Sequence, residues 1–160
     1  MTLPIPPETF AAFLVTAKGQ TYAAQGDDAT LPPLLPGSHQ LEYRDGALLY
    51  RDIYFGGAYF IGQETVYHHS SALWAMVYAG GVTGAAVRPA DVRQVYDFLR
   101  AALRQVAADR PYRGPGTFHQ GEYRYRAVSQ GALDCFWGVE TITHHDQPVY
   151  ELRYSGGLLR

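Results

Sequence analysis

Residues 60–82 read FIGQETVYHHSSALWAMVYAGGV, and residues 136–158 read FWGVETITHHDQPVYELRYSGGL. Aligned without a gap at an offset of 76 residues, nine of the 23 pairs are identical. These pairs are Phe60/Phe136, Gly62/Gly138, Glu64/Glu140, Thr65/Thr141, His68/His144, His69/His145, Tyr78/Tyr154, Gly80/Gly156 and Gly81/Gly157. A repeat of this length predicts two copies of one supersecondary unit, packed about a pseudo-twofold axis.

Each copy is expected to be a helix followed by an antiparallel meander. Apolar residues at helical spacing predict helices over residues 7–18 and 89–108. Alternating apolar patterns between turn signals predict strands after each helix. The expected strands span residues 39–44, 47–55, 58–68, 72–79, 121–130, 133–145 and 148–155.

These elements predict one α+β domain over residues 1–160, a tandem duplication of the units at about 7–82 and 89–160. The helices should pack on one face of a curved antiparallel sheet, or of two packed sheets. Gly80-Gly81 is expected to end the first meander. The long loop at residues 24–38, rich in Pro, Gly and Asp, is a candidate lid.

Strand alternation sorts the side chains onto two faces once the turns are placed. We place two-residue turns at Ser70-Ser71 and at Asp146-Gln147. The face expected to meet the helices then carries Tyr50, Asp52, Tyr54, Tyr59, Ile61, Gln63, Thr65, Tyr67, Trp74, Met76, Tyr78, Trp137, Val139, Thr141, Thr143, Tyr150, Leu152 and Tyr154. A one-residue error in either turn would exchange the faces.

The opposite face is expected to carry the repeated glutamates Glu64 and Glu140. They could converge at the pseudo-twofold axis as an acid and base pair or as metal ligands. The alternative is that each forms a cross-strand ion pair, Glu64 with Arg51 and Glu140 with Arg126 or Arg153.

Asp52 lies among tyrosines in the segment YRDIY. A carboxylate in such surroundings could hold the amine or hydroxyl of a ligand. It could equally be satisfied in the core by a tyrosine hydroxyl or a backbone N–H. Both interpretations stay open.

The bulk composition excludes several classes of protein. Hydrophobic residues make up 47% and charged residues 18% of the chain, as in a globular protein. The formal net charge is −2 without a block of like charge, so nothing favours duplex nucleic acid or an anionic membrane as a partner. The single cysteine, together with the lack of a leader or an 18-residue apolar run, predicts a cytoplasmic protein.

No cofactor or metal motif stands out. The pairs His68-His69 and His144-His145 place adjacent residues on opposite strand faces, so each pair offers one ligand per face. Cys135 inside a strand is typical of a small buried hydrophobe, although a nucleophile beside a histidine is the alternative. We therefore predict no metal and no cofactor, and whether the protein is an enzyme stays open.

The segments YRDIYFGGAYFIGQE, LWAMVYAGG and VYELRYSGGLLR resemble those of an uncharacterised bacterial domain family. The resemblance runs from AFLVTAK to the C-terminus. Some relatives carry an N-terminal helix-turn-helix of the Xre repressor type, which implies an effector-binding role for the domain in those proteins.

The leading hypothesis is therefore a small-molecule site between the two repeats. The candidate site residues are Asp52, Tyr50, Tyr54, Glu64, Trp74, Tyr78, Glu140, Tyr150 and Tyr154. One alternative is a hydrolytic enzyme that uses the Glu64/Glu140 pair. Another is a homodimerising interaction module without catalysis.

Overall fold

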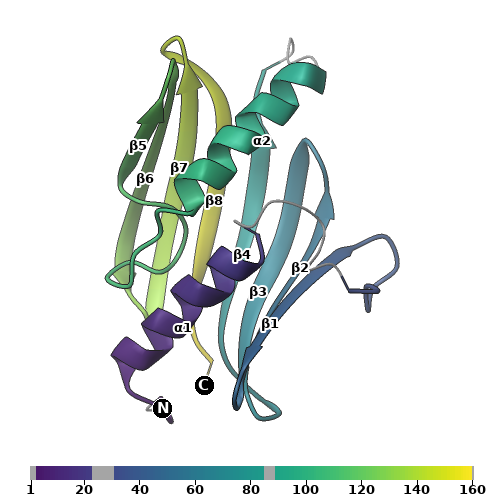
Figure 1. Cartoon of the computed structure of the whole chain (residues 1–160), viewed down its shortest axis with the longest axis vertical. Helices are drawn as coiled ribbons and strands as arrows, with labels where there is room; N and C mark the ends of the chain where they lie inside the picture. Colours follow the sequence, from purple (N-terminus) through teal and green to yellow (C-terminus); the bar gives the residue numbers. More distant parts are fainter. Residues whose placement is uncertain (1–2, 23–30, 85–88, 160) are drawn as a thin grey trace.

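One eight-stranded antiparallel sheet carries two helices across one of its faces (Figure 1). The computed structural model describes residues 3–22, 31–84 and 89–159, and every structural statement below refers to these. Helix α1 spans Pro7–Gln20 and α2 spans Pro89–Leu103. The strands are β1 (His39–Asp45), β2 (Leu48–Gly56), β3 (Tyr59–His68), β4 (Ser71–Val82), β5 (Thr117–Gln120), β6 (Tyr123–Ala132), β7 (Cys135–His144) and β8 (Gln147–Leu158).

The strand order is β1-β2-β3-β4-β8-β7-β6-β5. Each run of four consecutive strands is a meander, and the last strands of the two meanders pair antiparallel at the centre of the sheet. The meanders therefore form one sheet and not two packed sheets. The predicted α+β class, with an antiparallel sheet and both helices on one face, is confirmed.

The repeated glycine pairs Gly80-Gly81 and Gly156-Gly157 lie in the seam between β4 and β8, where the two meanders meet. A Cβ atom added to Gly80 would lie 2.3 Å from the carbonyl oxygen of Glu151, and one added to Gly156 would lie 2.3 Å from that of Ala75. Neither position has room for a side chain. The prediction that Gly80-Gly81 ends the first meander is wrong, because β4 continues through them to Val82.

The second half also differs from the prediction in the end of one helix and in one additional strand. Helix α2 ends at Leu103 and not at residue 108, because the N–H groups of Gln105 and Val106 bond three residues back, to the carbonyls of Ala102 and Leu103. Strand β5 was not predicted; it pairs with β6 through a tight turn at Gly121, whose φ is +58°. Residues 24–30 of the predicted lid lie outside the described residues.

The assignment of β3 and β7 to faces was wrong by one residue. The turns fall at His69-Ser70 and His145-Asp146, because His68 pairs with Ser71 and His144 with Gln147. A register shift follows in each hairpin, after which Glu64 pairs with Met76 and Glu140 with Leu152. Glu64 and Glu140 therefore face the helices, whereas Tyr59, Ile61 and Trp137 are exposed on the outer face. The residues predicted inward on β2, β4 and β8 do lie on the inner face.

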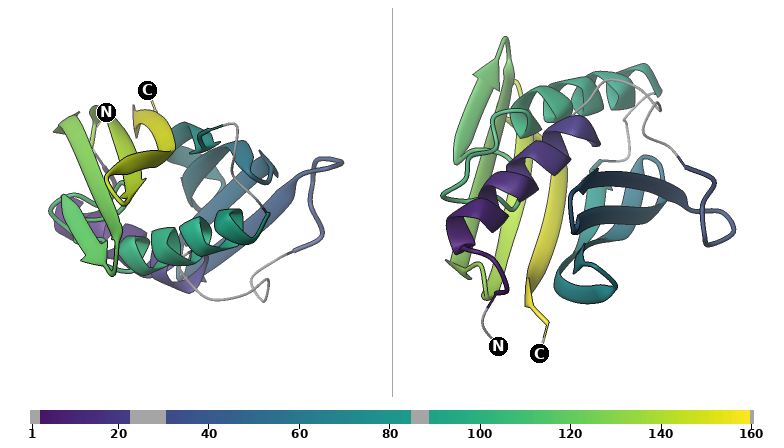
Figure 2. Two further views of the ribbon diagram at one scale, coloured as in Figure 1. Left: turned by 90° about the horizontal axis from the view of Figure 1, so that it is seen from above. Right: turned by 60° about the horizontal axis from the view of Figure 1, so that its bottom comes forward.

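Both views of Figure 2 show the two helices lying across the same face of the sheet. The hydrophobic core lies between these helices and that inner face. Helix α1 inserts Phe10 and Leu14, both fully buried, and the Phe10 ring lies edge-on to Trp74 with centroids 6.3 Å apart. Trp74 in turn stacks on Phe136, at 5.6 Å, across the central seam. Packing of α1 thus depends on one tryptophan that bridges both meanders.

Phe10→Ala should lower the free energy of unfolding by about 3–5 kcal/mol, because Phe10 is 0% exposed and its loss leaves a cavity beside Trp74. Phe55→Ala is the matched control, because Phe55 is 39% exposed on the outer face, and its effect should stay under about 1 kcal/mol. Urea unfolding of both variants measures the difference. Equal losses would show that α1 is not docked as described.

Candidate functional site

Five charged side chains are buried between the helical layer and the inner face of the sheet. The three carboxylates, Asp52, Glu64 and Glu140, come from strands β2, β3 and β7. The two cations, Lys18 and Arg113, come from α1 and from the segment that follows α2. Charged groups are rarely buried in this way without a partner. Their partners divide them into two groups, which we call the Glu140 network and the Asp52–Glu64 cluster.

The Glu140 network is fully hydrogen-bonded. The Glu140 carboxylate accepts two bonds from Arg113, from Nη2 at 2.7 Å and Nε at 3.2 Å. It also accepts bonds from the hydroxyls of Tyr125 at 2.7 Å and Tyr150 at 2.8 Å. Four donors on one buried carboxylate compensate its desolvation. Glu140 therefore holds the segment after α2 against the sheet.

Arg113 is enclosed by aromatic rings as well as by its carboxylate. Its guanidinium carbon lies 5.4 Å from the ring centre of Tyr22 and 5.5 Å from that of Tyr78. The next residue, Gly114, donates its N–H to the Tyr125 hydroxyl at 3.0 Å. A Cβ atom there would lie 2.8 Å from the Tyr125 ring, so glycine allows this approach.

The Asp52–Glu64 cluster consists of Lys18, Tyr50, Asp52, Glu64, Trp74 and Tyr78. The Lys18 ammonium forms an ion pair with Glu64. The same ammonium lies 5.7 Å from the ring centre of Tyr50 and 6.0 Å from that of Trp74. A carboxylate and two aromatic faces thus surround a cation that the chain itself supplies.

Asp52 and Glu64 are direct partners in the ladder between β2 and β3, on the same face. Like charges in this arrangement repel each other. Asp52 accepts a hydrogen bond from the Tyr78 hydroxyl at 2.6 Å. Gly62 makes this contact possible, because a Cβ atom there would lie 2.5 Å from that hydroxyl.

Burial, and after it the neighbouring Glu64, together raise the pKa of Asp52 to about 7, against the opposing effects of Tyr78, Lys18 and Arg113. Burial also lowers the pKa of Lys18, although its Glu64 partner works in the opposite direction. The cluster therefore holds one carboxylate more than its cations balance, and a proton on Asp52 takes up the difference near neutral pH.

Among the described residues, two buried side-chain polar atoms make no hydrogen bond of ordinary geometry, and both belong to this cluster: the Tyr50 hydroxyl and the Trp74 indole nitrogen. Burial raises the pKa of Tyr50, and the Glu64 carboxylate beside its hydroxyl raises that pKa further. A cavity of about 10 Å³ lies nearby, lined by Lys18, Tyr22, Glu64, Leu103, Tyr112 and Arg113. That volume is about what a single water molecule needs.

The structure brings together most of the candidate residues predicted from the sequence. The sheet side of the cluster consists of Tyr50, Asp52, Glu64, Trp74 and Tyr78. The adjoining network includes Glu140 and Tyr150. Tyr154 lies on the same inner face. Tyr54 lies outside both groups, stacked on His39 with ring centres 4.8 Å apart.

The predicted ion pairs of the glutamates are wrong, because the glutamates face inward and the arginines outward. Arg51 bonds Glu42, and Arg153 bonds Glu151. Glu64 and Glu140 instead pair with Lys18 and Arg113, which the sequence analysis did not select. Lys18 carried a signal: it is the chain's only lysine, and it lies on the buried face of α1, four residues after Leu14 and eight after Phe10. Arg113 carried no such signal.

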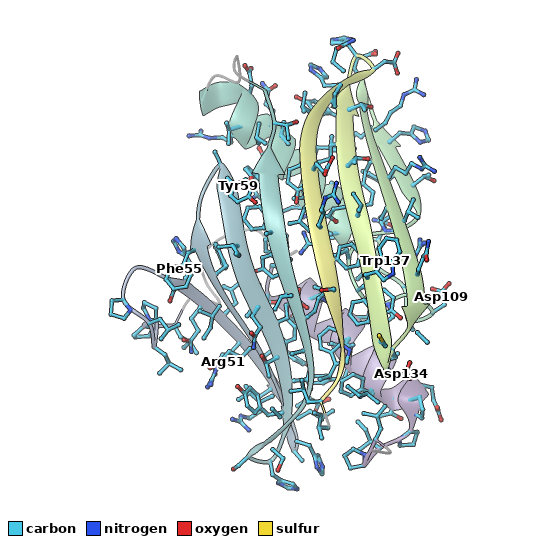
Figure 3. The ribbon with its side chains drawn as sticks, turned by 180° about the vertical axis from the view of Figure 1, so that it is seen from behind. Arg51, Phe55, Tyr59, Asp109, Asp134 and Trp137 are labelled. Carbon is cyan, nitrogen blue, oxygen red and sulfur yellow. The ribbon has the colours of Figure 1, made fainter. Side chains whose placement is uncertain are left out.

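Over β2, β3 and β4 the outer face of the sheet exposes large apolar side chains, namely Phe55, Tyr59, Ile61 and Val77. Figure 3 shows this face, with Phe55 and Tyr59 labelled. A groove of about 680 Å³ runs along it, lined by Leu34, Leu35, Arg51, Ile53, Phe55, Ile61, Gly62, Gln63, Thr65, Tyr67 and Val77. Cys135 is exposed, so its prediction as a buried hydrophobe is wrong. The predicted homodimer stays a prediction.

Among residues 3–22, 31–84 and 89–159, no three His, Cys, Asp or Glu side chains gather in a way that could hold a metal ion. Neither helix is long and apolar enough to cross a membrane.

Comparison with known proteins gives one match. The model of a family described as a domain of unknown function (DUF5680) matches residues 52–159. The chain belongs to this family. No curated protein and no solved structure matches the chain. The DUF5680 match begins at Asp52 and spans β3 to β8, so it includes all three buried carboxylates but not Lys18.

Lys18→Met should destabilise the protein by about 3–5 kcal/mol, because it leaves Glu64 buried without its cation. Lys18→Met/Glu64→Gln should recover most of that loss. Arg153→Met is the control, because it breaks the exposed pair with Glu151 and should cost less than about 1 kcal/mol. Urea unfolding at pH 7 measures all three, and a Lys18→Met variant as stable as Arg153→Met would contradict the buried pair.

Asp52→Asn should change how stability depends on pH. The pKa of Asp52 is about 7 in the folded protein against an ordinary value of 3.8, so the folded state binds more protons than the unfolded state between these values. The free energy of unfolding of the wild type, relative to Asp52→Asn, should therefore fall by up to about 4 kcal/mol as pH rises from 4 to 7, and level off above 8.

Urea unfolding between pH 4 and pH 8.5 tests this. The exposed Asp134→Asn is the control and should follow the wild type across the whole range. An Asp52→Asn curve parallel to that of the wild type would show that Asp52 is not the titrating group.

Proposed function

We propose that this protein binds a small molecule at the Asp52–Glu64 cluster, between the helical layer and the sheet. The binding residues would be Tyr50, Asp52, Glu64, Trp74 and Tyr78, with Glu140, Tyr150 and Tyr154 beside them. Tyr54 would lie at the margin. An effector-binding role of this kind agrees with the resemblance noted in the sequence.

The contrast between the two buried groups carries the proposal. Glu140 has four donors, and its network holds the fold together. The Asp52–Glu64 cluster instead combines two opposed carboxylates with a tyrosine hydroxyl and an indole N–H that make no hydrogen bond of ordinary geometry. Buried polar atoms without partners cost stability, and such costs concentrate at functional sites.

Access to the cluster requires movement of its cover. The interior cavity is of single-water size, and its lining includes Tyr22, Leu103, Tyr112 and Arg113 from the helical side. A ligand larger than water would have to displace some of these side chains. This supports binding coupled to a shift of the end of α1 or of the segment after α2, in which the sheet stays fixed.

Hydrolysis by the glutamate pair has less support. Each carboxylate is held by a separate buried cation, so neither is free to act as a general acid or base in this arrangement.

We also propose that the two halves arose by duplication of a helix-and-meander unit. Two observations support this: the nine identical pairs, and a strand order that runs β1 to β4 inward from one edge and β5 to β8 inward from the other. Glu64 and Glu140 would then be equivalent residues, one kept for structure and the other available for binding.

The two tryptophans allow a direct test, since Trp74 is buried in the cluster and Trp137 is exposed on the outer face. Trp137→Phe leaves Trp74 as the only fluorescent indole, and Trp74→Phe leaves Trp137. Fractions of a small-molecule extract from the expression host are titrated into both variants. At least one fraction should change the emission of Trp137→Phe but not that of Trp74→Phe, and Asp52→Asn should weaken the response at least tenfold.

A response confined to the Trp74→Phe variant would place binding on the outer face and refute the proposed site. A response that survives Asp52→Asn and Tyr50→Phe unchanged would do the same. If no fraction changes the emission of Trp74, the result would count against ligand binding altogether.

A further inference from the structure

The Asp52–Glu64 cluster has the chemistry of a receptor for positive charge. Its sheet side contains two carboxylates and the rings of Tyr50, Trp74 and Tyr78, and within the described residues the strands contribute no buried cation. Aromatic faces beside carboxylates favour ammonium and guanidinium groups. The chain already uses the surroundings in this way, since Lys18 and Arg113 both lie over these rings.

Among the described residues, the buried carboxylates outnumber the buried cations by one. The carboxylates are Asp52, Glu64 and Glu140, and the cations are Lys18 and Arg113. Glu140 forms an ion pair with Arg113, and Glu64 forms one with Lys18. Asp52 instead accepts a hydrogen bond from the neutral hydroxyl of Tyr78. A buried carboxylate without a cation must either hold a proton or receive a positive ligand.

We infer that the ligand is an organic monocation, an amine whose ammonium group binds Asp52 and lies against the aromatic side chains of the cluster. This inference rests on the proposed function and names its ligand class. The Tyr50 hydroxyl lies two residues from Asp52 on the same face of β2 and makes no hydrogen bond of ordinary geometry, so its oxygen would accept one from the ammonium. An anionic ligand would instead add a negative charge that no buried cation of the described residues balances.

Binding would exchange a proton for the amine. The protonated carboxyl of Asp52 releases H⁺, the ammonium takes its place beside the carboxylate, and the total charge of the interior is unchanged. The groups that face Asp52 are Tyr50 on its own strand, Glu64 on β3, Tyr78 on β4, Lys18 on α1 and Arg113 after α2. With the pKa of Asp52 at about 7, amine affinity should rise about tenfold from pH 6 to pH 8.

Two matched sets of compounds test the ligand class. The propyl set is propylamine, 1-propanol and butyrate, and the benzyl set is benzylamine, benzyl alcohol and phenylacetate. Each compound is titrated into the Trp137→Phe variant at pH 6 and pH 8, with Trp74 emission and calorimetry as readouts. An amine should bind more tightly than its alcohol and carboxylate counterparts and more tightly at pH 8, and at pH 6 it should release close to one proton.

Substitutions separate binding at Asp52 from general effects of amine salts. Asp52→Asn should weaken amine binding at least tenfold and remove its pH dependence. The exposed Asp134→Asn should leave both unchanged. Proton release is measured in wild type in two buffers of different ionisation enthalpy, so this readout does not depend on any variant.

The outcomes distinguish the two proposals. If an alcohol or a carboxylate perturbs Trp74 as strongly as the amine, the cation inference is wrong while the ligand site stands. If no amine binds, or if amine binding is independent of pH and of Asp52, the inference is likewise overturned. The proposed function is then decided by the extract titration alone.

Discussion

Antiparallel pairing between β4 and β8 is the contact on which the rest of the structure depends. It turns two meanders into one sheet with a continuous inner face, and glycines at positions 80 and 156 allow the strands to approach. Trp74, on β4, stacks on Phe136 across this seam and meets Phe10 of α1. Without the seam, neither half could bury its helix against a surface of sufficient width.

The continuous inner face also concentrates charge in the interior. Three strands each contribute one buried carboxylate, and α1 and the segment after α2 contribute the two buried cations. Burial of ions usually costs more than their mutual attraction restores, unless the remaining donors and acceptors are also satisfied. The Glu140 network meets that condition through its two tyrosines and Arg113. The Asp52–Glu64 cluster does not, and the proposed binding site rests on this difference.

Ligand binding at the proposed site would couple occupancy of the interior to the position of the helices. Lys18 links α1 to Glu64 through an ion pair, and Arg113 links the segment after α2 to Glu140 in the same way. Both links are ionic and directional, whereas the apolar contacts around them tolerate small displacements. A ligand that changes the charge at Asp52 would therefore act on α1 through Glu64 and Lys18, which is the arrangement an effector-responsive domain requires.

The sequence by itself determined both helices and every strand but β5, because helix periodicity and strand alternation are local patterns with short-range causes. It also selected Asp52, Glu64 and Glu140 as unusual. Only the tertiary structure decided which face they occupy, because a register shift of one residue in each hairpin reverses the alternation and depends on how the strands settle against the helices. Only the tertiary structure, likewise, paired Glu64 with Lys18, 46 positions away, since a buried ion finds its counter-ion in space and not along the chain.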